Sequence, residues 1–203
     1  MAKMVQKADA LEIINHWVLA GSFFLLAISG FGFLFHLNPV FSVFGGNMGM
    51  RNVHNWAGII FSLSLALSTV YYLPISLAYT GEDIAWILKG GGYLSKRTVV
   101  PPQDKLNAGQ KGYYLFLLVS GIAIAVSGFV IWLFPAGSGV RSWIQVSHLV
   151  HNICFVLMVV SVPTHIYLAT LANPGTLRIM LSGTVPLEWA RKRHARWIEK
   201  QGL

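Results

Sequence analysis

Charge is what this sequence most clearly lacks. Only 11% of its 203 residues are charged and 55% are hydrophobic, whereas about a quarter of the residues of an ordinary soluble domain carry a charge. The few charges are also clustered. No Asp, Glu, Lys or Arg occurs in four long stretches, residues 13–50, 52–81, 112–140 and 142–176. Too little polar sequence remains to cover the surface of a soluble protein of this size.

Each uncharged stretch exceeds the roughly 20 residues that a helix needs to cross about 30 Å of hydrocarbon. Backbone polar groups in lipid must be satisfied within their own segment, so these stretches should be helical. A buried core helix is an alternative for any one of them, but not for four. We therefore predict an all-α, integral membrane four-helix bundle. It forms a single domain over residues 1–203, with helices near 15–35, 54–79, 113–134 and 147–172 and a basic tail at 176–203.

Cysteine is almost absent as well. The single Cys154 excludes an intrachain disulfide, a cysteine-ligated iron–sulfur cluster and a four-cysteine zinc site. It lies inside the fourth apolar stretch, where a small buried hydrophobe is the simpler interpretation.

The basic residues are distributed unevenly along the chain. Of fifteen Lys and Arg, only Arg51 and Arg141 fall between the first and second or the third and fourth predicted helices. The remaining Lys and Arg lie in the N-terminal segment, in the loop between the second and third helices and in the tail. These three segments share one side of the membrane, which the positive-inside rule identifies as the cytoplasm. We expect a multi-pass protein of the bacterial inner membrane with both termini cytoplasmic. Its basicity indicates contact with lipid rather than with nucleic acid.

Histidines supply the chemistry inside the apolar stretches. Ionisable residues within a membrane are costly, so each is a functional candidate. Given the predicted helix directions, His16 and His165 lie near the inner face, and His54 and His151 lie near the outer face. Two histidines from different helices at one depth are what bis-axial haem ligation requires. A hydrogen bond between helices is the alternative for any single histidine, but four at paired depths favour two b haems.

The fourth helix is predicted to carry a ligand for each haem. Fourteen residues separate His151 from His165, which places them within roughly 40° of one helix face and about 21 Å apart. His148 is a rival outer ligand, but it lies roughly 100° from the His165 face, and a hydrogen-bonding or propionate role suits it better. His36 and His194 have no partner at a matching depth, so we assign them no haem.

Small residues accompany the histidines in the apolar stretches. Glycines there either let a flat macrocycle approach the backbone or allow close helix packing. Pro163 should bend the fourth helix just before His165. The glycines concerned are Gly21, Gly30, Gly32, Gly58, Gly121 and Gly128.

At these residues the chain resembles the gamma (cytochrome b) subunit of respiratory formate dehydrogenase. The resemblance covers nearly the whole chain and also extends to the cytochrome b subunits of nickel–iron hydrogenases. Its most specific parts are the run Asn107-Ala108-Gly109-Gln110-Lys111 and the tail. The matching elements are Asn15-His16-Trp17, His54 with Gly58, the Asn107–Lys111 run, the His151/His165 spacing, and Trp189-Ala190-Arg191-Lys192 with His194 and Arg196-Trp197.

The resemblance implies a membrane anchor that passes electrons from an outer iron–sulfur beta subunit through two haems to menaquinone or ubiquinone on the cytoplasmic side. Asn107, Gly109, Gln110 and His165 would line the quinone site, although Asn107 is alternatively a helix N-cap. Formate oxidation would take place on a molybdenum- or tungsten-containing alpha subunit, so this chain has no catalytic residue of its own. A higher oligomer of that heterotrimer is compatible with the resemblance.

Two other functions remain open from the residues alone. The first is a cytochrome b subunit serving a hydrogenase or a thiosulfate or polysulfide reductase. The second, of a different class, is a small histidine-dependent transporter. A proton-coupled transporter usually keeps a carboxylate or lysine at mid-depth in the membrane, and this sequence has none there.

Overall fold

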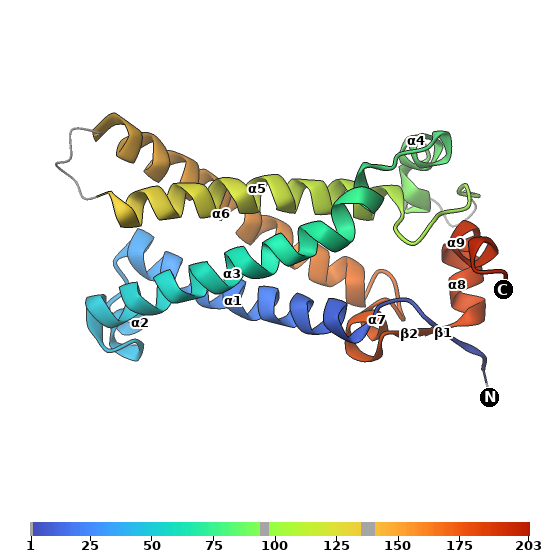
Figure 1. Cartoon of the computed structure of the whole chain (residues 1–203), viewed down its shortest axis with the longest axis horizontal. Coiled ribbons are helices and arrows are strands. Elements are labelled where there is room, and N and C mark those ends of the chain that lie inside the picture. The colour runs from blue at the N-terminus through green and yellow to red at the C-terminus, as the bar shows by residue number, and fades with distance from the viewer. Residues whose placement is uncertain (1, 94–97, 135–140) are drawn as a thin grey trace. The chain divides into compact units, whose positions relative to one another are not determined.

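A computed structural model describes residues 2–93, 98–134 and 141–203 of the chain. Within these residues the prediction of an all-α fold is confirmed: four helices are long and apolar enough to cross a membrane (Figure 1). They are α1 (Ala10–Phe35), α3 (Gly46–Leu77), α5 (Ala108–Leu133) and α6 (Arg141–Thr170). The shorter elements are α2 (Asn38–Val43), α4 (Gly81–Leu88), the 3-10 turn η1 (Gly90–Gly92), α7 (Leu177–Ser182), α8 (Leu187–Arg193), α9 (Ala195–Lys200) and the strands β1 (Met4–Gln6) and β2 (Thr184–Pro186).

All four long helices begin before the predicted ranges. The predictions started each helix where the apolar run starts, but polar residues continue the backbone hydrogen bonding beyond it. Two starts are explained by reciprocal caps. Asp9 accepts the Glu12 N–H at 2.7 Å while its own N–H donates to Glu12 at 2.9 Å. Asn107 and Gln110 make the same exchange before α5, at 2.9 and 3.0 Å.

The chain divides into two compact units, each described separately below. The first contains Met1–Ile13, Ser68–Phe116 and Leu168–Leu203, and the second contains Ile14–Leu67 and Leu117–Tyr167. All seven acidic residues belong to the first unit, whereas Arg51 and Arg141 are the only charged residues of the second.

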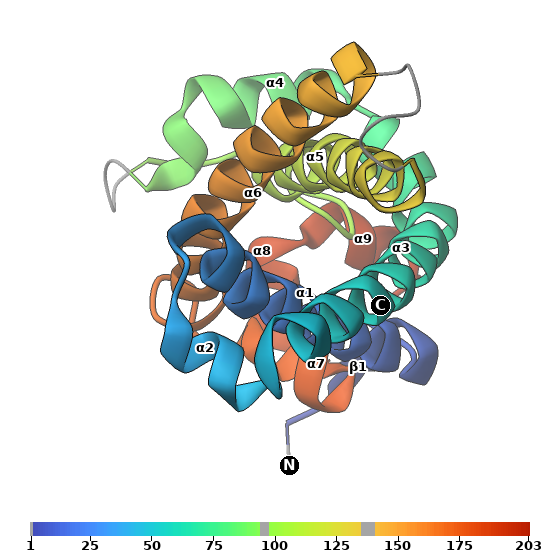
Figure 2. The same ribbon diagram turned by 90° about the vertical axis from the view of Figure 1, so that its left-hand side faces the viewer.

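The second unit is a bundle of the larger parts of α1, α3, α5 and α6, which lie alongside one another in both Figures 1 and 2. Many of its large apolar side chains are exposed, as lipid contact requires. Small polar groups join the helices instead. Ser64 of α3 donates to the Asn15 side chain of α1 at 2.6 Å, and the Asn15 amide donates to the Ser64 carbonyl at 3.1 Å. This contact fixes α1 beside α3 at the residue that precedes His16.

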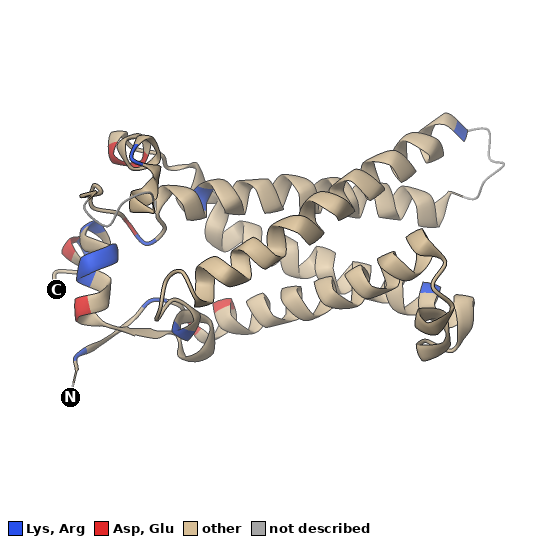
Figure 3. Ribbon diagram, turned by 180° about the vertical axis from the view of Figure 1, so that it is seen from behind, with Lys and Arg blue, Asp and Glu red and all other residues tan. Residues whose placement is uncertain are grey.

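The first unit has its own hydrophobic core and nearly all of the charge, and Figure 3 shows the long helices almost free of charged residues. Strands β1 and β2 pair antiparallel, with Val5 opposite Val185, so the N-terminal segment lies beside the tail. A three-residue strand is too short for a sequence pattern to reveal, and it was not predicted. The core around it consists of Val5, Ala8, Ile179, Val185, Leu187, Ala190, Trp197 and Ile198.

A buried ion pair ties α4 to the first turn of α5. Asp83 accepts hydrogen bonds from the Thr80 N–H at 2.8 Å, the Thr80 hydroxyl at 2.9 Å and Lys111 Nζ at 2.8 Å. Burial by itself raises the pKa of Asp83, but the hydrogen bonds from Lys111 and Thr80 outweigh burial and hold the pKa below its ordinary value. The pair anchors the segment that carries the Asn107–Gln110 cap.

His194 fastens the tail to the loop before α5. His194 is 2% exposed, its ring lies 5.6 Å from that of Trp189 at an angle of 38°, and its Nδ1–H donates to the Asp104 carbonyl at 2.6 Å. Burial, followed by the nearby charge of Lys7, lowers the pKa of His194 to about 3. Lys7 is itself buried, with Nζ 5.3 Å and 5.6 Å from the ring centres of Trp189 and Trp197. The tail is therefore docked around a neutral imidazole.

Acid should release this tail. An undocked His194 takes up a proton below about pH 6.5, whereas the docked one stays neutral down to a pKa of about 3. Docking is therefore strongest above the undocked pKa and is lost as the pH falls below it. Cleavage at Glu188 and Glu199 by a glutamate-specific protease, normalised to a free tail peptide, should accelerate more than about tenfold from pH 7 to pH 5.

His194→Asn is the matched variant for this measurement. Its amide keeps a donor for the Asp104 carbonyl but does not titrate, so its cleavage should change little over the same range. Equal acid sensitivity of the two proteins would show that His194 is not the responsible group.

Candidate haem sites

His54 of α3 and His151 of α6 face each other inside the second unit. Their ring centres lie 6.3 Å apart with the planes inclined at 55°. His16 of α1 and His165 of α6 form a second pair, with ring centres 6.4 Å apart and planes inclined at 41°. The structure thus brings together both pairs that the sequence predicted. In each case one partner comes from α6.

The separation of the rings suits one metal ion between two imidazoles. A ring nitrogen lies about 1.1 Å from its ring centre and binds a first-row metal at about 2 Å, so two opposed imidazoles on one iron should have centres about 6 Å apart. No group of three or more His, Cys, Asp or Glu side chains that could hold a metal ion occurs among the described residues. Paired axial ligation is therefore the chemistry that these histidines fit.

Hydrogen bonds orient the two rings of the His54/His151 pair. The Ser29 hydroxyl donates to the Leu25 carbonyl at 2.7 Å, so it accepts at 2.7 Å from Nδ1–H of His54. Nδ1–H of His151 donates to the Ile124 carbonyl at 3.0 Å. Both rings therefore keep the unprotonated Nε2 for a metal. A metal-bound histidine usually donates its other N–H in this way, which fixes its tautomer and orientation.

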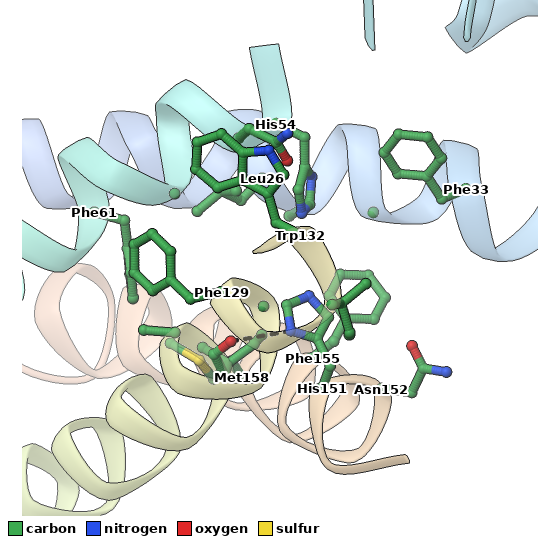
Figure 4. Close-up of a pocket in the computed structure, with 18 of the residues that line it drawn as sticks. Leu26, Phe33, His54, Phe61, Phe129, Trp132, His151, Asn152, Phe155 and Met158 are labelled. Atoms are coloured by element: carbon green, nitrogen blue, oxygen red, sulfur yellow. Dashed lines mark hydrogen bonds between the residues drawn. The ribbon is translucent and has the colours of Figure 1, made fainter. Parts of the chain in front are cut away.

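A cavity of about 490 Å³ surrounds this pair, within the size range of cofactor pockets. Figure 4 shows His54 and His151 entering it from opposite walls, among aromatic and aliphatic side chains. The cavity is mostly apolar, but Arg51 and His148 also line it. A b haem has an apolar macrocycle and two propionates, so an apolar slot with basic groups on its wall matches both parts of the molecule.

Glycines make room for the cavity and for the histidine rings in it. Gly30, Gly58 and Gly128 line it. A Cβ on Gly128 would lie only 3.0 Å from Cε1 of His151. Gly32 and Gly121 instead make room for the side chains of neighbouring residues in the bundle, namely Met50 and Leu65, and Gly21 has no atom within 4 Å of its would-be Cβ. Gly30, Gly58 and Gly128 therefore lie where a macrocycle could approach the backbone. Gly32 and Gly121 serve close helix packing instead.

In the second pair, His16 differs from His54 and His151 in the partner of its Nδ1. His16 Nδ1 is buried and has no hydrogen-bond partner. An unpaired buried ring nitrogen is costly, and a metal ion or a hydrogen-bonding group of a bound molecule would satisfy it. Pro163 lies inside α6 two residues before His165. A proline there removes one helix hydrogen bond and loosens the turn that carries the ring.

The other histidines fall into different places. His148 lines the cavity but makes no ring pair among the described contacts, so His151 is the residue that faces His54. His36 is exposed at the end of α1 with a positive φ of 51°. His194 belongs to the first unit, where it holds the tail. Cys154 is buried and free, as expected.

In the first unit, Asn107 and Gln110 cap α5, so the capping role considered for Asn107 is confirmed. Gly109 packs against Trp86, whose ring would lie 3.0 Å from a Cβ at that position. A quinone site at this segment stays a prediction.

Sequence reasoning missed the groups that orient the rings. Ser29 and the Ile124 carbonyl do not resemble ligands, and nothing local links them to histidines 25 and 27 residues away. A small polar residue within an apolar stretch was the one available signal for Ser29. Arg51 was interpreted only as a loop charge.

Comparison with known proteins agrees with this geometry. A family profile described as prokaryotic cytochrome b561 matches residues 7–183 of the chain. The chain is 32% identical over 200 residues to the cytochrome b556(fdo) subunit of formate dehydrogenase from Escherichia coli K12, covering 97% of this chain and 92% of that protein. It is 27% identical over 207 residues to the nitrate-inducible cytochrome b556(Fdn) subunit of the same organism, covering 98% and 92%. The cytochrome b556 subunit of formate dehydrogenase from Haemophilus influenzae is 25% identical over 202 residues, covering 94% and 80%.

Substitution of Gly128 should disrupt only one of the two pairs. In Gly128→Ala the new methyl group meets the His151 ring at 3.0 Å and displaces it from the Ile124 carbonyl. Haem affinity at that pair should fall by about 10- to 100-fold, while haem at the His16/His165 pair is retained. Pyridine haemochrome content and redox-difference spectra of the purified protein measure both effects. Gly81→Ala, where no atom lies within 4 Å, is the control, and full haem content in Gly128→Ala would contradict the assignment.

Proposed function

The chain belongs to the prokaryotic cytochrome b561 family, and from that premise we propose that it is the membrane-anchoring dihaem cytochrome b subunit of a formate dehydrogenase complex. In this proposal it passes electrons from an iron–sulfur subunit through two b haems to quinone. The observation that carries the proposal is the presence of two facing histidine pairs, 6.3 and 6.4 Å between ring centres, that share helix α6. Transport of a solute offers no reason for such pairs at these separations.

Each haem has named protein ligands in this proposal. His54 and His151 would hold the outer haem, and His16 and His165 the inner one. Haem iron, when bound, supplies reversible one-electron transfer. Ser29 and the Ile124 carbonyl would fix the orientation of the two rings of the outer pair. Arg51 on the cavity wall would pair with a propionate, because a guanidinium binds a carboxylate strongly in an apolar setting, and His148 would donate a hydrogen bond to a propionate.

The distribution of charge supports the proposed sidedness. The first unit carries the N-terminal segment, the tail and nearly all basic residues, and the positive-inside rule favours the cytoplasm for such a unit. The His54/His151 pair would then lie toward the periplasm. An iron–sulfur beta subunit would deliver electrons there, from a catalytic alpha subunit that oxidises formate.

Quinone reduction would take place on the cytoplasmic side. Asn107, Gly109 and Gln110 would line the quinone site, with proton uptake from the cytoplasm. Electrons taken from outside and protons taken from inside would together build membrane potential. The capping bonds of Asn107 and Gln110 leave one carbonyl lone pair and the amide N–H groups of each side chain for a ligand.

Loss of one ligand should remove one haem only. His16→Ala or His165→Ala should abolish the inner haem and leave the outer one reducible, giving about half the haem per protein. His54→Ala or His151→Ala should do the reverse, and His36→Asn should change neither. Haem-to-protein ratio and low-temperature α-band spectra measure this. Retention of both haems in any of the four alanine variants would overturn the pairing, and a colourless wild-type protein would favour the transporter instead.

Membrane sidedness can be measured with single cysteines on a Cys154→Ser background. Val43 in α2 and Leu203 at the end of the tail are both exposed. A membrane-impermeant maleimide added to spheroplasts should label Val43→Cys at once and Leu203→Cys only after lysis. The opposite pattern would reverse the proposed direction of electron flow.

A further inference from the structure

Glu12 is the only carboxylate within the described residues of the four membrane-spanning helices. It lies in the first turn of α1 and is 6% exposed. A buried charge at the edge of a membrane is costly and is a functional candidate by default. The function proposed above uses the histidines and the Asn107–Gln110 segment, and it gives Glu12 no task.

Glu12 is more buried than the groups it contacts, which come from three different segments. Lys105 Nζ donates to Oε1 at 2.8 Å, and the Lys105 side chain is 27% exposed. Oε2 accepts the Asp9 N–H at 2.9 Å. The Tyr72 hydroxyl of α3 also bonds the Glu12 side chain. The ring of Tyr72 in turn lies 5.7 Å from that of Tyr114 in α5. Glu12 thus connects Lys105, in the loop before α5, with tyrosines of the membrane-spanning helices α3 and α5.

Capping alone does not require this carboxylate. The same chain caps α5 with the neutral pair Asn107 and Gln110, which makes the same reciprocal hydrogen bonds as Asp9 and Glu12. A glutamine at position 12 would therefore serve the cap equally well. What glutamate adds is a group that takes up and releases a proton.

We propose that Glu12 is the proton-relay residue for quinone reduction, receiving protons from the Lys105 side and passing them toward the quinone. This inference rests on the proposed function. Each quinone that takes two electrons also takes two protons and leaves as quinol. The Glu12 carboxylate binds one proton at a time and returns to its charged form when that proton moves on. Its position supports this role, because Glu12 precedes the haem ligand candidate His16 by four residues, about one turn of α1.

The charged and titratable groups that face Glu12 define its setting. Asp9 belongs to its own cap, Lys105 to the loop before α5, and Tyr72 to α3. Lys105 forms an ion pair with the carboxylate and is more exposed to solvent than Glu12 itself. The Tyr72 hydroxyl both donates and accepts, so it can hand a proton onward without a net change in its own charge.

The test uses the full complex in native membranes and two separate electron sources. Formate added to membranes measures electron entry from the partner, and a short-chain quinol added in its place measures exchange at the quinone site. In Glu12→Gln both haems should remain at wild-type content and formate should reduce them at the wild-type rate. Quinol-driven haem reduction and formate-driven quinone turnover should both fall at least about tenfold, as loss of a positioned proton carrier typically causes.

Matched variants separate proton transfer from structure. Asp9→Asn alters the exposed partner in the same cap and should leave quinone exchange unchanged. Glu12→Asp keeps a carboxylate and should recover part of the rate lost in Glu12→Gln.

The outcomes are distinct. Quinone exchange at the wild-type rate in Glu12→Gln would overturn the relay. Wild-type haems that respond to quinol but not to formate would reject the formate dehydrogenase assignment and leave the relay standing on the quinol measurement. Haems that respond to neither would reject both.

Discussion

The facing of two imidazoles from separate helices, with ring centres 6.3 Å apart in one pair and 6.4 Å apart in the other, is the constraint on which the second unit depends. It fixes the depth of His16, His54, His151 and His165 along their helices. It also fixes which face of α6 points inward, because that helix supplies a ring to each pair. The apolar character of the helices, their small residues and their serines all serve this arrangement, since they let helix backbones approach without adding charge.

The two pairs differ in how their rings are held. Around the His54/His151 pair, Ser29 and the Ile124 carbonyl each receive an Nδ1–H, so Nε2 is the unprotonated nitrogen of each ring. His16 has no such acceptor on Nδ1. Hydrogen bonds to axial ligands and burial are among the means by which a protein tunes a haem. The same ligand type therefore stands in two different settings, as two haems in series would require.

The first unit solves the opposite problem, because it gathers the charge that the bundle excludes. Buried or partly buried ion pairs, the β1–β2 pairing and a neutral His194 hold the N-terminal segment, the middle loop and the tail together. The Asn107–Gln110 and Asp9–Glu12 caps begin two of the spans from this unit. One cap is neutral and the other is acidic, and that difference is what singles out Glu12.

The sequence by itself determined the membrane class, the four spans and the pairing of the histidines. These follow from uncharged length and from depth along a helix, both of which are properties of sequence separation alone. Helix starts were placed too late, because capping residues rather than hydrophobicity decide where a helix begins. Only the tertiary structure decided the roles of Ser29, the Ile124 carbonyl, Gly128 and His194. Each of these acts on a residue at least 23 positions away, and only the packing of the helices and the tail brings such residues within hydrogen-bonding or van der Waals distance.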